Sequence, residues 1–249
     1  MKELVSIITP LYNSKKFIAD TLESVINQSY TNWEMLIVDD CSTDNGAKIV
    51  KKYSQNDNRI KYFKQNINKG PAKTRNKAIK LANGRYIAFL DSDDLWKKNK
   101  LKKQLEYMKN NDFAFTFTRY QKINENGEKK GHISVPKKVN YKELLKHNVI
   151  GCLTAMYDIR AIGKVYMPDI LRRQDYGLWL RILKKVKYAY GLDENLAYYR
   201  VRKNTVSSNK IKAAQYQWKI YRSVENLNLL KSMYYFSHYA IKGIIKYLK

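Results

Sequence analysis

Short apolar runs alternate with amphipathic segments along the first hundred residues of the chain. The apolar runs predict buried strands, whereas apolar side chains that recur every three or four residues predict helices. The predicted strands cover residues 4–9, 33–38, 59–63 and 85–90, and the predicted helices cover 16–28, 45–53, 72–82 and 97–109. This alternation predicts an α/β fold with a doubly wound, mostly parallel sheet and right-handed crossovers.

The pattern is less regular after residue 110. Residues 113–120 alternate like a strand, Asn126-Gly127 predicts a hairpin turn, and residues 133–135 would form the returning strand. A short helix at 141–146 and a strand at 151–157 follow. We expect this half of the chain to complete a mixed sheet.

Polar clusters follow three of the predicted strands. They are Asp91, Asp93 and Asp94 after residues 85–90, Asp39 and Asp40 after residues 33–38, and Pro10-Leu11-Tyr12-Asn13 after the first strand. The carboxyl ends of parallel strands share one sheet edge, where ligands bind in open α/β sheets. Crowded carboxylates there favour Mg²⁺ or Mn²⁺, which keeps sites for substrate phosphate. The alternative is helix capping, by Asp94 in one cluster and by Ser42 or Thr43 in another.

The turn after the first strand, Thr9-Pro10-Leu11-Tyr12-Asn13-Ser14, contains no glycine. A dinucleotide-binding turn needs Gly-x-Gly-x-x-Gly, so that the backbone can approach a pyrophosphate closely. The Walker pattern Gly-x-x-x-x-Gly-Lys-Ser/Thr is also missing from the sequence. Any bound phosphate must therefore be held by a metal ion and cationic side chains.

Five motifs together resemble those of the family 2 glycosyltransferases, which have the GT-A fold. They are Val5-Ser6-Ile7-Ile8-Thr9-Pro10-Leu11-Tyr12-Asn13, the run from Glu34 to Asp44, the run from Asn68 to Asn76, Phe89-Leu90-Asp91-Ser92-Asp93-Asp94, and the run from Arg173 to Arg181. In the last motif Gln174 stands where the family usually has an acidic residue. The resemblance points to bacterial enzymes that build cell-surface polysaccharides such as teichuronic acid.

The resemblance implies a domain organisation. Residues 1–208 would form a GT-A catalytic domain, with a nucleotide-sugar-binding half at 1–95 and an acceptor-side half at 96–208. In this fold the central sheet is doubly wound and mostly parallel, and the acceptor-side half adds strands of mixed direction. Residues 209–249 would form a basic, aromatic helical segment at the C-terminus.

The resemblance also implies roles for individual residues. Asp91 and Asp93 match the Asp-x-Asp pair, and Asp93, joined by Asp91 or Asp94, would bind Mn²⁺ or Mg²⁺. The implied substrate contacts are Thr9 and Tyr12 at the nucleotide base, Asp40 at the uracil ring, Arg75 at the base or diphosphate, Asp91 at the ribose or sugar, and Pro10, Ser92, Trp179, Arg200 and Arg202 elsewhere around the substrates. Residues 199–202 and Ser207 resemble a loop that closes over the diphosphate. Relatives often have His where Arg202 stands, and Arg202 can supply only charge.

Asp175 is the candidate general base. Transfer from a nucleotide sugar releases a nucleoside diphosphate, whose charge a divalent ion and cationic side chains stabilise. A carboxylate can accept the proton of the attacking hydroxyl, and one base opposite the leaving group predicts inversion. The residues alone leave two further roles open for Asp175, a helix cap or a partner of Arg172. The resemblance favours the base.

The charge of the chain is strongly basic, with 48 Lys and Arg against 22 Asp and Glu and a net charge of +26. Such a field attracts anions, but zinc-finger, RNP-like and Gly-x-x-Gly signatures are missing, so we expect no nucleic-acid partner. Residues 210–249 carry eight Lys or Arg and one Glu among many aromatic residues, which is typical of helices on an anionic membrane surface. The alternative is a pair of helices packed against the catalytic domain.

The remaining sequence features bear on location and activity. Without a visible signal peptide or an apolar run of roughly 18 residues, the chain is expected to be cytoplasmic and peripheral on the inner face of the cell membrane. The predicted activity is metal-dependent transfer of a sugar from a UDP-sugar, with inversion. The expected acceptor is a glycan, or a glycan linked to a lipid pyrophosphate, that belongs to a cell-surface polysaccharide. One alternative is a haloacid-dehalogenase-like phosphatase or phosphotransferase, which would need an Asp where the first strand ends in Thr9-Pro10. The other is a non-catalytic module that binds anionic membranes.

Overall fold

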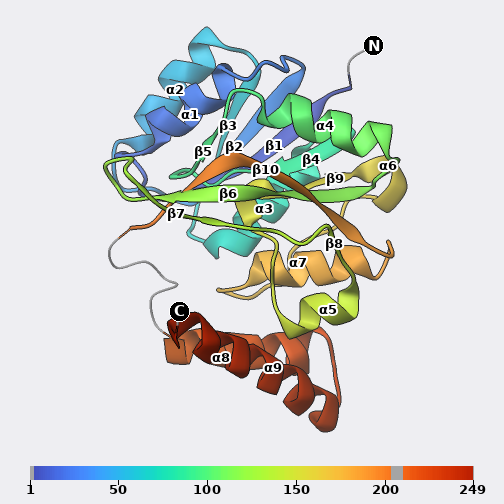
Figure 1. Ribbon diagram of the computed structural model, residues 1–249. Coiled ribbons are helices and arrows are strands. Elements are labelled where there is room, and N and C mark those ends of the chain that lie inside the picture. Colours follow the sequence, from blue (N-terminus) through green and yellow to red (C-terminus); the bar gives the residue numbers. More distant parts are fainter. Residues whose placement is uncertain (1–2, 203–209, 249) are drawn as a thin grey trace.

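In the computed structural model, which describes residues 3–202 and 210–248, ten strands form one mixed sheet (Figure 1). The main strand order is β3-β2-β1-β4-β9-β6-β10-β5, and β7 and β8 pair with β6 and β10. The strands are β1 (Val5–Leu11), β2 (Trp33–Asp39), β3 (Ile60–Lys64), β4 (Tyr86–Phe89), β5 (Leu95–Trp96), β6 (Phe115–Ile123), β7 (Lys129–Ile133), β8 (Lys138–Val139), β9 (Met156–Asp158) and β10 (Ala189–Arg200). The helices are α1 (Ile18–Ile26), α2 (Gly46–Asn56), α3 (Gly70–Leu81), α4 (Lys100–Asn110), α5 (Tyr141–Lys146), α6 (Ile159–Ile162), α7 (Gln174–Leu183), α8 (Lys210–Lys219) and α9 (Leu229–Leu248).

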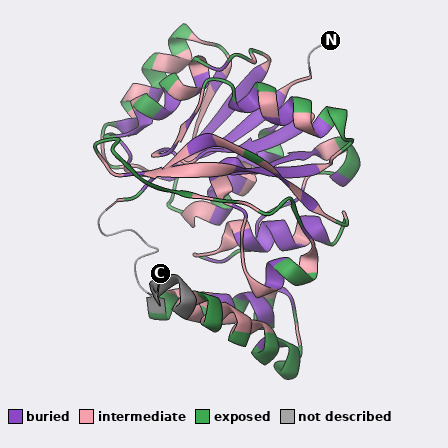
Figure 2. Ribbon diagram, viewed as in Figure 1, coloured by how far each residue is buried: buried purple, intermediate pink, exposed green. Residues whose placement is uncertain are grey.

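Strands β1 to β4 form the parallel half that the alternating pattern predicts. Both faces of this half are covered, because side chains alternate across a strand. Ile7 packs with residues of α1, whereas its neighbour Ile8 packs in the cluster that includes α3 and α7. Figure 2 shows the resulting buried sheet between helices whose outward faces are exposed.

Several of the predicted element boundaries are wrong. The returning strand of the hairpin, expected at 133–135, is β7 at Lys129–Ile133. The helix predicted from residue 97 begins at Lys100, because Leu95 and Trp96 pair with β10 as a short strand. Asp94 therefore does not cap that helix. The strand predicted at 151–157 is a 3₁₀ turn at Cys152–Thr154 followed by β9, and the Trp96 indole N–H donates to the Leu153 carbonyl at 2.8 Å.

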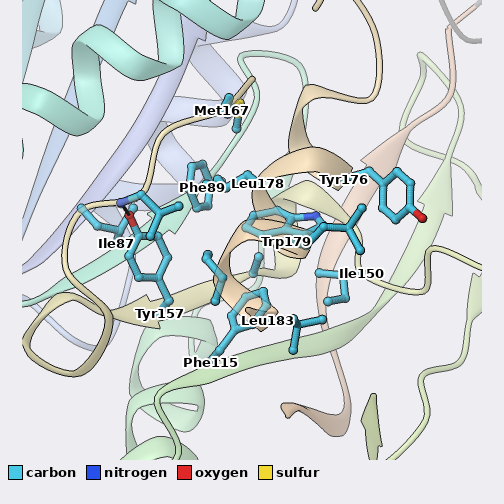
Figure 3. Close-up of a cluster of buried hydrophobic side chains, with 14 of the residues drawn as sticks. Ile87, Phe89, Phe115, Ile150, Tyr157, Met167, Tyr176, Leu178, Trp179 and Leu183 are labelled. Carbon is cyan, nitrogen blue, oxygen red and sulfur yellow. Dashed lines mark hydrogen bonds between the residues drawn. The ribbon is translucent and has the colours of Figure 1, made fainter. Parts of the chain in front are cut away.

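Trp179 lies in the hydrophobic core between α7 and the sheet (Figure 3). Its side chain is fully buried, and its ring centroid lies 5.3 Å from that of Phe89 and 5.5 Å from that of Phe115. The expectation that Trp179 contacts substrate is wrong, because the ring fills the core and does not reach a cavity wall. Its place in the motif reflects packing.

The C-terminal helices α8 and α9, joined through a π-helical turn at Ile220–Val224, pack below α5 and α7 (Figure 1). The buried Tyr221 hydroxyl donates to the Leu145 carbonyl at 2.6 Å, and Lys184 pairs with Glu225 at 2.6 Å. One face of the pair is thus docked on the catalytic domain, as the packing alternative predicts. None of the described helices is long and apolar enough to cross a membrane.

Candidate active site

A cavity of about 1100 Å³ opens where β1, β2 and β4 end and reaches the C-terminal helices. We call its two sides the strand end, formed by Pro10, Tyr12, Asp40, Asp91 and Asp93, and the helix end, formed by Arg172, Gln174, Asp175, Lys212 and Tyr216. The predicted site residues that line this cavity are Pro10, Tyr12, Asp40, Arg75, Asp91, Ser92, Asp93, Asp175, Arg200 and Arg202. Residues far apart in the sequence are therefore brought into one cavity.

Asp40 is held rigidly at the strand end. Its Oδ1 accepts hydrogen bonds from Gln65 Nε2 and the Lys69 N–H, both at 2.7 Å, and its Oδ2 accepts one from the Gly70 N–H at 2.8 Å. These bonds tie the end of β2 to the first turn of α3, where an anion also meets the positive end of the helix dipole. A carboxylate has about four acceptor sites, so one remains for a ligand N–H.

Arg75 and Asp91 form the centre of the cavity. Arg75 is buried, and its Nη2 donates to Asp91 Oδ1 at 2.5 Å. Burial opposes the charge of Arg75, but Asp91 outweighs it and raises the pKa of the guanidinium. Its Nε and Nη1 are buried without a hydrogen-bond partner in the described part of the chain. A fixed cation with two unused donors is suited to an oxyanion ligand.

Asp93 and Asp94 have different roles although they are neighbours. Asp93 lines the cavity and pairs with Arg202 at 2.8 Å, and burial next to Asp91 raises its pKa. Asp94 is buried outside the cavity lining, where its Oδ1 accepts the Arg200 backbone N–H at 2.8 Å. The expectation of Asp94 as a metal ligand is therefore wrong, because its carboxylate anchors β10.

The residues at the strand end fit a hard divalent ion that a ligand completes. Among residues 3–202 and 210–248, no three potential ligand side chains gather in a ready-made site. Of the strand-end carboxylates, Asp40 is occupied by three hydrogen bonds, which leaves Asp91 and Asp93 to offer oxygens to an ion. Mg²⁺ commonly uses one or two carboxylates and takes its other ligands from substrate phosphates and water. The donor set suits Mg²⁺ or Mn²⁺ in the presence of a diphosphate.

Asp175 occupies the first turn of α7 and lines the cavity. Burial raises the pKa of its carboxyl group, the Tyr176 backbone N–H and Arg75 lower it, and Asp91 adds to the rise. Among the described residues Asp175 forms no ion pair with Arg172. The N-cap position of α7 is held by Arg173, which has a φ of 59° and makes no side-chain capping bond. Asp175 is thus a carboxylate of increased basicity that faces a cavity.

Thr9 and Ser207 are the remaining predicted positions. Thr9 is fully buried within β1 and does not line the cavity, so its expected contact with a base is wrong. The neighbouring ring of Tyr12 is 52% exposed at the cavity rim and is the better placed of the two. Ser207 lies outside the described residues.

Sequence reasoning identified Asp175 at the helix end but missed most of the residues that surround it. Residues Asn148, Cys152 and Arg172 line the cavity, and so do Lys212, Ala213 and Tyr216 of α8. The contact between the start of α7 and α8 joins segments forty residues apart, which no local motif reports. One signal of an unusual site was available in Gln174, which lines the cavity and stands where the family usually has an acidic residue.

The chain is similar in sequence to known glycosyltransferases. A family model described as glycosyl transferase family 2 matches residues 6–162. A Bacillus subtilis protein provisionally named as the teichuronic acid biosynthesis glycosyltransferase TuaG is 47% identical over 248 residues, covering 99% of this chain and 98% of its own length. The Escherichia coli enzyme UDP-Glc:alpha-D-GlcNAc-diphosphoundecaprenol beta-1,3-glucosyltransferase WfgD is 40% identical over 245 residues, covering 98% of this chain and 95% of its own.

A solved structure shares the fold. The crystal structure of Staphylococcus aureus TarS residues 1–349 in complex with UDP superimposes with a TM-score of 0.68 and 27% sequence identity, over 81% of this chain. The chain spans about three fifths of that structure, 61% of its length. The expected GT-A fold, with its mostly parallel central sheet and C-terminal helices, is confirmed.

Proposed function

The chain belongs to glycosyltransferase family 2, and on that premise we propose that it transfers a sugar from a UDP-sugar to a lipid-linked surface glycan, with inversion at the anomeric carbon. The observation that carries the proposal is one cavity with a carboxylate and arginine cluster at its strand end and Asp175 at its helix end. At about 1100 Å³ it exceeds the roughly 300–1000 Å³ that enclose a drug-sized ligand. Donor and acceptor would share it. Family membership sets aside the phosphatase and the non-catalytic alternatives.

The strand end is the proposed donor site. Asp40 keeps one acceptor position for the N–H of uracil, and the exposed ring of Tyr12 offers a stacking surface for the base. The unused donors of Arg75 would meet the diphosphate or the sugar, and Arg200 and Arg202 add positive charge. The name of TuaG refers to teichuronic acid biosynthesis, and the name of WfgD gives UDP-Glc as its donor.

Asp93, with Asp91, is the proposed holder of Mn²⁺ or Mg²⁺. When bound, the ion supplies positive charge that stabilises the departing diphosphate. Arg202, which pairs with Asp93, would add positive charge beside the phosphate oxygens. The carboxylates and the arginines thereby keep the total charge of the donor complex near balance.

Asp175 is the proposed general base. The acceptor oxygen forms its bond to the anomeric carbon as the bond from that carbon to the diphosphate oxygen breaks, and the acceptor proton passes to Asp175. A raised pKa brings the carboxylate closer to the working pH, where a base is most effective. Attack from the face opposite the diphosphate gives inversion.

The acceptor is proposed to be carried by a lipid diphosphate at an anionic membrane. The acceptor named for WfgD is a diphosphoundecaprenol-linked sugar. In this chain the outward face of α9 exposes Leu230, Met233 and Ile241 by 78%, 55% and 54%. Apolar side chains on a basic helix suit the headgroup layer, which would place the protein peripherally on the inner face of the membrane.

A panel of nucleotide sugars tests the proposal. We expect slow hydrolysis of one UDP-sugar that requires Mn²⁺ or Mg²⁺, and transfer of the same sugar to a synthetic lipid-diphosphate acceptor. Proton NMR of the product reports the anomeric configuration. Retention of configuration, or activity with only GDP- or dTDP-sugars, would contradict the proposal.

A further inference from the structure

Helix α8 forms one wall of the cavity and does not merely follow the catalytic domain. Lys212, Ala213 and Tyr216 line the cavity opposite the start of α7. The helix is fixed there, because Arg173 donates from Nε to the Ala213 carbonyl at 3.2 Å and from Nη2 to the Tyr239 hydroxyl at 3.0 Å. Gln217 further donates to the Tyr221 hydroxyl at 2.6 Å. The C-terminal segment thus helps to shape the helix end.

Arg172 differs sharply from its neighbour Arg173. Its guanidinium lies 5.9 Å from the centre of the Tyr216 ring, and its Nη1 is buried without a hydrogen-bond partner among the described residues. Arg172 is half-buried, and native structures rarely leave a buried donor such as its Nη1 without a hydrogen-bond partner. The aromatic ring holds the guanidinium in place, and an oxyanion in the cavity would satisfy it.

Gln174 adds a second unmatched group beside Arg172. Its Oε1 is buried and accepts no hydrogen bond from the described residues. It directly precedes Asp175, the proposed base. A sugar hydroxyl or amide N–H would satisfy this oxygen, so the two residues offer complementary contacts to one molecule: a donor for an anion and an acceptor for a sugar.

We propose that Arg172, Tyr216 and Gln174 form an acceptor subsite that binds an oxyanion carried by the acceptor close to its reacting sugar. This inference rests on the proposed function. Arg172 stands just before α7, three residues ahead of Asp175, and both residues line the cavity. The anion would therefore lie near the sugar whose hydroxyl is deprotonated. Two sources share this chemistry, the diphosphate of a lipid carrier and the carboxylate of a uronic acid. The charge of Arg172 would select an anionic acceptor, and Tyr216 of α8 would complete the subsite.

The test compares three synthetic acceptors with the same terminal sugar: an alkyl diphosphate, a uronide-bearing alkyl glycoside and a neutral alkyl glycoside. For Arg172→Gln we expect kcat/KM to fall at least tenfold with one anionic acceptor, mainly through KM, while the neutral acceptor and UDP affinity are unchanged. The acceptor whose kcat/KM falls identifies the anion that Arg172 binds. Arg172→Lys, which keeps the charge without the planar fork, should recover part of the loss.

Controls separate the possible failures. Arg160→Gln makes the same change at a residue that is outside the cavity lining, and it should alter no acceptor. If the wild-type protein binds no UDP and hydrolyses no UDP-sugar, the proposed function itself fails. Suppose that the wild type is active and that Arg172→Gln lowers kcat/KM equally for all three acceptors, or for none. The subsite is then refuted while the proposed function stands. Should Arg172→Gln not fold, Arg172→Lys against the same acceptors gives the same decision.

Discussion

The strand end and the helix end of the cavity are built differently. At the strand end each carboxylate already has protein partners: Asp40 accepts three hydrogen bonds, Asp91 pairs with Arg75, and Asp93 pairs with Arg202. At the helix end one polar atom of Arg172 and one of Gln174 are buried without a hydrogen-bond partner among the described residues. The carboxylates of the strand end are thus organised before a ligand arrives, and Arg75 keeps two donors for it, whereas Arg172 and Gln174 at the helix end have these contacts still to make. This difference suits a nucleotide bound the same way throughout a family and an acceptor that varies.

The largest effect is expected for Asp175→Asn, at the boundary of the two ends. The amide keeps the size of the side chain but cannot accept a proton, so transfer should fall by roughly a hundredfold or more while UDP affinity is preserved. Single-turnover transfer and UDP titration on the same preparation measure both. Unchanged transfer would remove the named base, and a collapse of UDP affinity would assign Asp175 to the donor site. Asp193 and Glu194 are poor substitutes, since they pair with Arg119 and Lys103 outside the cavity lining.

The next effect is expected at the strand end, for Asp93→Ala. Removing the carboxylate should abolish the metal dependence of UDP binding, with a loss of about tenfold or more in the presence of Mn²⁺. Calorimetric titration with and without the ion is the measurement. Asp193→Ala, an exposed carboxylate outside the cavity lining, is the matched control. If Asp93→Ala binds UDP with wild-type metal dependence, the ion is held elsewhere.

Asp40→Ala should affect binding and folding together, because the carboxylate also holds α3. The N–H groups of Lys69 and Gly70 would lose their acceptor, which predicts a stability loss of about 1–3 kcal/mol. UDP and UDP-sugar affinities should fall alike, since uniform binding is lost. Urea denaturation and calorimetry report the two losses separately. Weaker UDP binding at unchanged stability would mean that the bonds to α3 contribute little.

A change on the outward face of α9 should leave both ends of the cavity untouched. Leu230→Glu combined with Met233→Glu removes exposed apolar surface without altering the docked face. We expect loss of sedimentation with anionic vesicles and unchanged hydrolysis of the donor in solution. High salt should reproduce part of the loss, because it screens the basic surface. Full vesicle binding by this variant would remove α9 as the contact.

The two ends also differ in how far the sequence predicted them. Asp40, Asp91 and Asp93 directly follow apolar runs, and the carboxyl ends of parallel strands necessarily meet, so local pattern and topology were sufficient. The same pattern misassigned Trp179 and Thr9, because a motif position does not reveal whether a side chain points into the core or into a cavity.

Apart from Asp175, the helix end was beyond such reasoning for a physical reason. The wall formed by Tyr216 depends on the docking of α8 against α7, a contact between amphipathic surfaces whose partner no local periodicity identifies. Composition alone left docking and membrane binding as alternatives for residues 210–249. The docked face of α8 and α9 and the exposed face of α9 show that the two are compatible.

Lys100 is another buried polar residue without a hydrogen-bond partner among the described residues, but it lies away from the cavity. It is fully buried, and its Nζ lies 3.9 Å from the centre of the Trp96 ring. Burial lowers its pKa well below the usual lysine value. We interpret Lys100 as a buried group whose charge the fold disfavours, whereas Arg172 lines a cavity in which a ligand can meet its unpaired donor.

Lys100→Met should therefore stabilise the fold by about 1–3 kcal/mol at pH 7 and leave transfer unchanged. Between the lowered pKa of the folded protein and the ordinary value of about 10.4, the unfolded chain binds the additional proton. Wild-type stability should then rise with pH over that range, since unfolding takes up a proton. This contribution should vanish in Lys100→Met. Urea denaturation of both proteins at pH 7 and about pH 9.5 measures the difference, and equal pH dependence or lost transfer would give Lys100 a functional charge.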